Sequence, residues 1–144
     1  MIAGEFYHIF NRGNNREIIF KEPRNYAFFL QKFKHYLGDK VEVHAYCLMP
    51  NHFHFLSKAK PITDKLKSKI EQGGTKRGLA FLSGDVPAST FYESQFASLF
   101  KSYTNAINKQ EENRFGGLFK AKFRRTLVKD KKDFLHFLCY VHHN

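Results

Sequence analysis

Residues 41–57 place the tightest constraint on how this chain can fold. Apolar residues stand at every second position from Val41 to Cys47, as in a strand with one face buried. Pro50-Asn51 then interrupts the pattern with typical turn residues, and a second alternating stretch begins at His52. Two such stretches joined by a short turn predict a β-hairpin, and therefore a pair of antiparallel strands.

The second strand of this hairpin carries two histidines on one face. Successive side chains of a strand point to opposite sides, so His52 and His54 project together. Phe53 and Phe55 then point the other way, where they can enter a core. Two neighbouring imidazoles can share a divalent metal ion. A His-x-His pair also occurs as ordinary polar residues on the wet face of a strand, so the pair alone leaves both interpretations open.

The other predicted elements complete an α+β fold of the ferredoxin-like type. They are a strand over 5–11, a helix from Pro23 to Gly38, a long helix from about 89 to 110, a strand over 122–128, and a final helix after Asp130. The order β-α-β-β-α-β plus a C-terminal helix predicts an antiparallel sheet with helices on one face. The other face would be free for nucleic acid or a partner.

We expect a single domain over 1–144 that contains one basic insertion. Residues 58–88 are rich in lysine and punctuated by glycine and proline, which predicts a short helix near 62–71 followed by a loop. This insertion is either solvated surface or a DNA contact. The final helix runs to Asn144 without a capping glycine or a polar tail, so we expect the natural chain to continue beyond it.

The net charge favours a polyanionic partner. Lys and Arg number 24 against 13 Asp and Glu, which gives +11 over 144 residues. A charge of this size in a compact domain is typical of nucleic-acid binders. There are two alternatives: the charge serves only solubility, or it binds an anionic membrane. The membrane is the weaker one, because no segment is long and apolar enough to span it.

The two cysteines predict neither a disulfide nor a zinc site. Cys47 and Cys139 lie far apart and form no Cys-x-x-Cys motif. We expect free, mostly buried thiols in a reducing compartment, which places the protein in the cytoplasm with the nucleoid.

Four motifs in this chain occur in an order that resembles the single-tyrosine HUH transposases, in particular the REP-associated tyrosine transposases. They span residues 7–15, 50–54, 102–109 and 116–119. The resemblance covers most of the chain outside 58–88. It implies an enzyme that cuts single-stranded, hairpin-flanked DNA through a tyrosine, leaving a 5′-phosphotyrosine and a free 3′-hydroxyl. It also implies Mg²⁺ or Mn²⁺ as cofactor, and imidazole ligands favour Mn²⁺.

By position, the resemblance makes His52 and His54 the metal-binding pair and Tyr103 the nucleophile. In relatives, an amide side chain about one helical turn after the tyrosine completes the metal site. Here Asn108 stands five residues after Tyr103, about 140° round the helix, and would reach the metal only from a distorted or oblique helix. Tyr103 also falls on the apolar stripe of its helix, where a tyrosine is usually a core residue.

Several residues are candidates for contact with DNA, because they offer cations or backbone donors to phosphate. They are Arg12, Gly13, Asn14, Arg16, Lys120, Lys122, Arg124 and Arg125. Three other histidines, His8, His44 and His136, are expected to be structural or exposed. His44 would support His54 if the hairpin register placed the two side by side. A homodimer is compatible with the resemblance, as is a monomer.

The leading hypothesis is a metal-dependent DNA nickase and strand transferase. One alternative is a non-catalytic nucleic-acid-binding module of ferredoxin-like fold that uses aromatic residues on its sheet. A plain metal-dependent hydrolase is a third, but it needs a carboxylate-rich site, and the sequence near the histidines has none.

Overall fold

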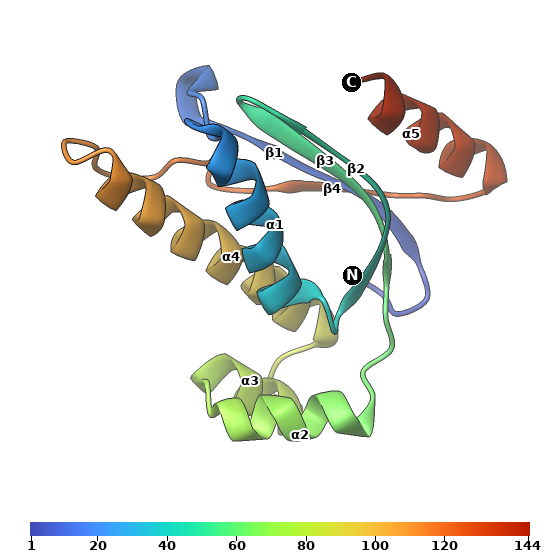
Figure 1. Ribbon diagram of the computed structural model, residues 1–144. Coiled ribbons are helices and arrows are strands. Elements are labelled where there is room, and N and C mark those ends of the chain that lie inside the picture. Colours follow the sequence, from blue (N-terminus) through green and yellow to red (C-terminus); the bar gives the residue numbers. More distant parts are fainter.

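Four antiparallel strands form the sheet in the computed structural model, which describes residues 1–144 (Figure 1). They are β1 (Phe6–Arg12), β2 (Val41–Met49), β3 (His52–Ala59) and β4 (Arg124–Leu127). Their spatial order is β2-β3-β1-β4, with every neighbouring pair antiparallel. The predicted ferredoxin-like fold is confirmed, including the hairpin that turns at Pro50-Asn51 between β2 and β3.

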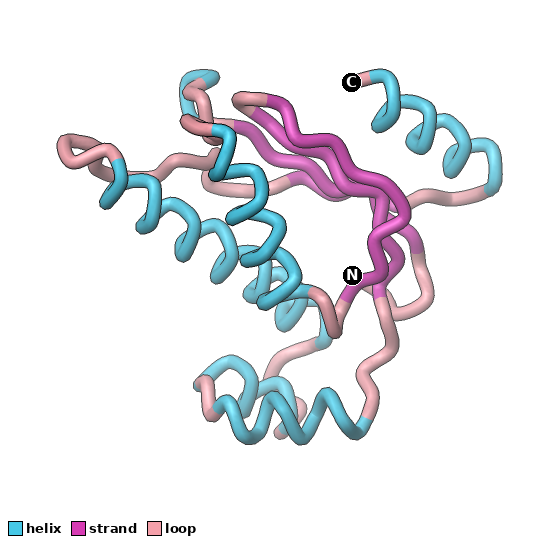
Figure 2. Tube along the Cα trace, in the orientation of Figure 1, coloured by secondary structure: helices cyan, strands magenta, loops and turns pink.

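Two helices, α1 (Pro23–Leu37) and α4 (Ala88–Gln110), cover one face of the sheet (Figures 1 and 2). Both bury an apolar stripe with helical spacing, such as Phe29 and Phe33 of α1. These rings pack against Phe53 and Phe55 of β3, which point to the same side because the strand alternates. The main core therefore lies between the sheet and this helix layer.

The C-terminal helix α5 (Lys131–His143) packs on the opposite face of the sheet. Asp130 caps its start, as predicted, by accepting a hydrogen bond from the backbone N–H of Asp133. Val141 joins Ala45 and Leu56 in a small second core. The expectation that this face stays open is therefore wrong along part of its length, because α5 covers it.

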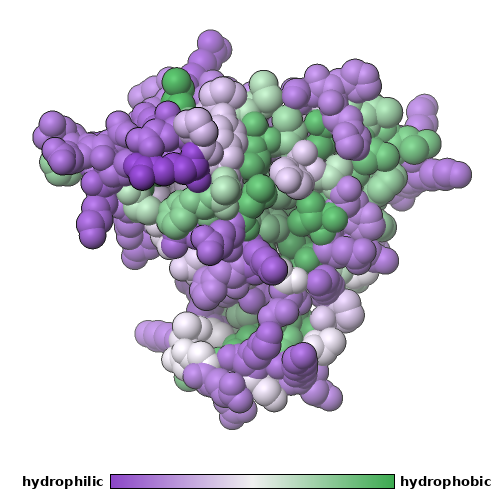
Figure 3. Space-filling model, in the orientation of Figure 1, coloured by the Kyte–Doolittle hydropathy of each residue, from purple (hydrophilic) through white to green (hydrophobic).

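The insertion forms two helices, α2 (Asp64–Gly73) and α3 (Lys76–Leu82), where one helix and a loop were expected. Gly74 adopts φ +60° and ends α2, so this glycine caps a helix instead of marking a loop. Leu66 and Ile70 bury their side chains against Phe91 near the start of α4. The α2–α3 unit projects below the sheet and carries a mainly hydrophilic surface (Figures 1 and 3).

Both cysteines are free, as predicted, but their burial was not predicted correctly. Cys47 is partly buried and Cys139 is exposed on α5. No helix has the length and apolar character needed to cross a membrane.

Candidate functional site

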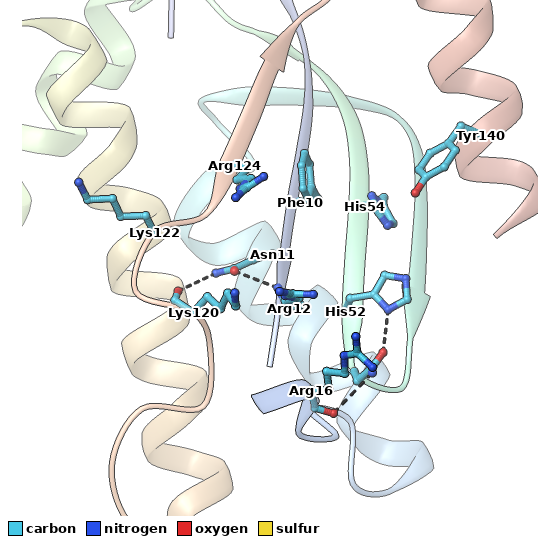
Figure 4. Close-up of a pocket in the computed structure, with 11 residues that line it drawn as sticks. Phe10, Asn11, Arg12, Arg16, His52, His54, Lys120, Lys122, Arg124 and Tyr140 are labelled. Carbon is cyan, nitrogen blue, oxygen red and sulfur yellow. Dashed lines mark hydrogen bonds between the residues drawn. The ribbon is translucent and has the colours of Figure 1, made fainter. Parts of the chain in front are cut away.

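A cleft of about 600 Å³ opens on the face of the sheet that α5 partly covers (Figure 4). Its floor is formed by the ends of β1 and β3, its flanks by residues 120–124 and by Tyr140 of α5. It is lined by 11 residues: Phe10, Asn11, Arg12, Arg16, Asn51, His52, His54, Lys120, Lys122, Arg124 and Tyr140. The strand alternation explains the floor, because His52 and His54 face away from the core that Phe53 and Phe55 fill.

The histidine pair is held by hydrogen bonds from its own neighbourhood. The ring centroids of His52 and His54 lie 5.2 Å apart. His52 Nδ1 lies 2.7 Å from Asn51 Oδ1, and because an amide oxygen can only accept, the proton sits on Nδ1. Burial lowers the pKa of His52, so the ring stays neutral with the lone pair of Nε2 available.

His8 stands behind His54 and was expected only to be structural or exposed. The two rings share a buried hydrogen bond of 3.0 Å between His8 Nε2 and His54 Nδ1. Burial lowers the pKa of each to about 4, with the neighbouring imidazoles adding to the shift. His8 is therefore the residue that supports His54. His44 was expected to support His54 only if the hairpin register placed the two side by side. It sits at a register shift in β2, where Cys47 is the residue opposite His54, and its ring lies 3.6 Å from Glu42.

Tyr140 of α5 is the tyrosine that this cleft contains. Its ring stands perpendicular to that of His54, with centroids 5.2 Å apart. The side chain is 43% exposed, and Figure 4 shows its hydroxyl turned toward the histidine strand. The hydroxyl makes no hydrogen bond within the protein, so a ligand can reach it.

Tyr103, the predicted nucleophile, lies on the other side of the sheet. It is fully buried among Phe20, Phe29 and Phe119, and its hydroxyl donates to the backbone carbonyl of Ile19 at 2.8 Å. Burial raises its pKa. The structure does not bring this side chain to the histidines, so its assignment as nucleophile is corrected: Tyr103 is a core residue.

Asn108, the third metal ligand considered from the sequence, likewise lies away from the cleft. Its side chain donates to the carbonyl of Gly116 at 3.0 Å and accepts from Arg114, which ties the end of α4 to the following loop. Asn144 is the amide that sequence reasoning missed. It stands four residues after Tyr140, one helical turn, and its side-chain amide donates to the backbone carbonyl of Tyr140 at 2.6 Å. Its backbone carbonyl accepts from the thiol of Cys47, the residue opposite His54 on β2. The interval of one helical turn between a tyrosine and an amide, which the resemblance implies, is therefore present at 140–144.

Two neighbouring neutral imidazoles suit a divalent ion such as Mn²⁺ or Zn²⁺, which binds histidine through a ring nitrogen. No group of three or more His, Cys, Asp and Glu side chains that could hold a metal is present in the chain. Any further ligand from this chain must then be of another type, and the side-chain oxygen of Asn144 is of the right chemistry.

The cleft is strongly basic and contains no acid. Five of its lining residues are cations and none is Asp or Glu. No salt bridge involves any of the five, which are Arg12, Arg16, Lys120, Lys122 and Arg124. Unpaired cations gathered around a concave surface favour a polyanionic ligand.

Three of the residues predicted to contact DNA do not line the cleft. Arg125 points away from the cleft, because β4 alternates, and pairs with Glu93 at 2.5 Å. Gly13 is buried, and a Cβ there would lie 2.1 Å from the carbonyl oxygen of Glu17. Asn14 donates to the carbonyl of Gly117 at 3.0 Å. Gly13 and Asn14 thus fix the turn that presents Arg12 and Arg16.

Solved structures with this fold include two transposase-related proteins. A REP-associated tyrosine transposase bound to a REP hairpin matches 98% of this chain with a TM-score of 0.64 and 15% sequence identity. This chain spans 66% of that protein's length. A candidate transposase from Deinococcus radiodurans matches 99% of this chain and 92% of its own, with a TM-score of 0.51 and 12% identity. No family model and no curated protein matches the chain. The fold implied by the resemblance is confirmed by these neighbours.

Proposed function

We propose that this chain is a transposase-like enzyme that nicks and rejoins single-stranded DNA through Tyr140. The observation that carries the proposal is the meeting of one accessible tyrosine, a neutral histidine pair and an acid-free basic wall in one cleft. A cleft used only for binding has no need of an imidazole pair beside a free phenol. A hydrolytic site built on carboxylates is not supported, because no acid lines the cleft.

Tyr140 would act as the nucleophile. Its phenolic oxygen attacks the phosphorus of one phosphodiester, a new tyrosine O–P bond forms, and the bond from phosphorus to the 3′-oxygen breaks. The phenolic proton passes to water, and the departing 3′-oxygen takes up a proton. No water is added to the phosphorus, so the reverse attack by a 3′-hydroxyl rejoins the strand. A phenol ordinarily has a pKa near 10, which makes it a weak nucleophile at neutral pH.

His52, His54 and Asn144 would hold a divalent metal ion, Mg²⁺ or Mn²⁺. Such an ion, when bound, supplies Lewis-acid polarisation of a phosphate oxygen. Asn51 and His8 contribute by fixing the two rings through their other nitrogen atoms. The roles of His52 and His54 are those that the resemblance implied. The nucleophile and the amide move from α4 to α5.

The five unpaired cations would bind the DNA backbone on both sides of the reacting phosphate. One relative with this fold was solved with a REP hairpin. We therefore propose single-stranded DNA next to a hairpin as the substrate of this chain as well. The ring of Phe10 stacks on that of His8, with centroids 5.0 Å apart, and lies at the floor of the cleft. A DNA base can pack against this ring.

Incubation with end-labelled hairpin DNA and Mn²⁺, followed by a denaturing gel, tests the proposal. The expected result is a protein–DNA adduct that requires Tyr140 and is removed by a chelator. Tyr140→Phe should bind the same DNA with nearly unchanged affinity and form no adduct. Binding without any adduct in the unaltered protein would instead favour the non-catalytic nucleic-acid-binding module.

A further inference from the structure

Two consecutive residues at the rim of the cleft adopt a backbone conformation that normally belongs to glycine. Asn15 (φ 50°) and Arg16 (φ 61°) are the non-glycine residues of the chain with positive φ, and both lie in the short 3₁₀ segment η1 (Asn14–Arg16). For residues with a Cβ this conformation is disfavoured by contact with the following carbonyl. Asparagine tolerates it better than arginine. An arginine there carries a conformational cost that a glycine would avoid.

The strained backbone is held in place by the turn of the β2–β3 hairpin, at Pro50-Asn51. The carbonyl oxygen of Arg16 accepts from Asn51 Nδ2 at 3.5 Å, and the same amide accepts from His52 through its oxygen. The N–H groups of Ile19 and Phe20 both donate to the carbonyl of Pro50, at 2.8 and 3.1 Å. The Arg16 backbone is thus linked through one side chain to a ring of the histidine pair, as Figure 4 shows.

The guanidinium of Arg16 has no partner within the protein, although an acid, Glu17, is the next residue in the sequence. Glu17 is occupied by Arg114, which donates to both carboxylate oxygens at 2.6 and 2.7 Å. Lys21 also contacts Glu17, at 3.2 Å. Arg16 makes no salt bridge and no side-chain hydrogen bond, and it lines the cleft on the side of His52 (Figure 4). An unpaired cation on a strained backbone at the rim of a cleft indicates that its partner is a ligand bound in the cleft.

We infer that Arg16 binds the two non-bridging oxygens of the phosphodiester that Tyr140 attacks, and that it stabilises the charge that gathers there as the phosphorus becomes five-coordinate. This inference rests on the proposed function and adds a catalytic residue to it. Arg16 acts through its charge and its hydrogen bonds alone, so no proton or electron moves through it. Its planar donors suit two oxygens of one phosphate, which a lysine ammonium cannot match.

A glycine substitution at position 16 separates the contribution of the Arg16 side chain from that of its backbone conformation. Arg16→Gly keeps the left-handed backbone, and with it the carbonyl contact to Asn51, because glycine adopts positive φ without strain. Asn15→Gly is the matched control, since it relieves the same kind of strain at a residue that does not line the cleft. Arg16→Lys keeps the charge but loses the paired donors.

The measurements are the single-turnover rate of adduct formation at saturating hairpin DNA with Mn²⁺, the Kd for an uncleavable analogue, and the melting temperature. We expect Arg16→Gly to lose about 100-fold or more in rate, as for removal of one donor to a developing oxyanion. Its Kd should change less than about 10-fold, and its melting temperature should not fall. Asn15→Gly should match the unaltered protein in rate, and Arg16→Lys should lie between.

A rate for Arg16→Gly close to that of the unaltered protein would overturn the inference. So would a loss of rate fully explained by weaker DNA binding, or a lowered melting temperature that makes the arginine a structural residue. Absence of any adduct with the unaltered protein refutes the proposed function itself, so the two failures are distinguishable.

Discussion

Replacing Tyr103 by phenylalanine separates its structural role from the catalytic role that the sequence first indicated. The substitution keeps the ring packing and removes one hydroxyl, whose hydrogen bond to the Ile19 carbonyl is 2.8 Å long and buried at both ends. Loss of one such bond, with the carbonyl left unpaired, costs about 1–2 kcal/mol. For a domain of this size that lowers Tm by roughly 3–8 °C. Adduct formation at a temperature where the variant is folded should be unchanged.

Urea unfolding followed by circular dichroism measures the stability, and the gel assay measures the adduct. Tyr92→Phe is the matched control, because Tyr92 is buried on the same helix and its hydroxyl donates to the Lys60 carbonyl. It should lose a similar free energy of unfolding. Tyr140→Phe should keep its stability and lose the adduct. A Tyr103→Phe protein of undiminished stability that forms no adduct would refute the placement of Tyr103 in the core and return the nucleophile to α4.

Three further predictions concern the supports of the cleft. Pairing with Arg114 lowers the pKa of Glu17 from 4.5 to about 2, so its stabilisation is complete above about pH 4.5 and is lost as the pH falls toward 2. Glu17→Gln should lower the free energy of unfolding by about 1–2 kcal/mol at pH 7, a figure that allows for the partial exposure of the pair. It should also reduce the change of the urea midpoint with pH between pH 4.5 and 2. Gly13→Ala should destabilise by about 2–4 kcal/mol in the same measurement, because the new methyl group meets the Glu17 carbonyl. Arg124→Ala should reduce the slope of log K against log salt for single-stranded DNA by about 0.7, whereas Arg125→Ala, whose cation is paired outside the cleft, should leave it unchanged. Equal slopes for the two variants would contradict the assignment of the cleft as the DNA-binding surface.

The strands along the chain and the face of β3 that carries the histidine pair could be predicted because both follow from local patterns. Alternation on β3 sends His52 to one side and Phe53 to the other wherever the strand sits in the sheet. The insertion was harder, since Gly74 marks a helix end and a loop equally well until Leu66 and Ile70 are seen to pack on α4.

The choice of tyrosine could not be made in that way. Tyr103 and Tyr140 both lie on helices with an apolar stripe, and the resemblance favoured the first. The interval from Tyr140 to Asn144 is one helical turn, and from Tyr103 to Asn108 it is not, so the better signal was present in the sequence. This interval was not used because no local sequence pattern reveals that α5 packs on the face of the sheet that carries the histidines.

The sequence by itself determined the elements, their polar and apolar sides, and the excess of positive charge, since each depends on spacing and composition along the chain. The tertiary structure decided which helix covers which face of the sheet. That choice depends on burial summed over residues distant in the chain, such as Val141 against Ala45 and Leu56. It placed one tyrosine in the core and another beside the imidazoles.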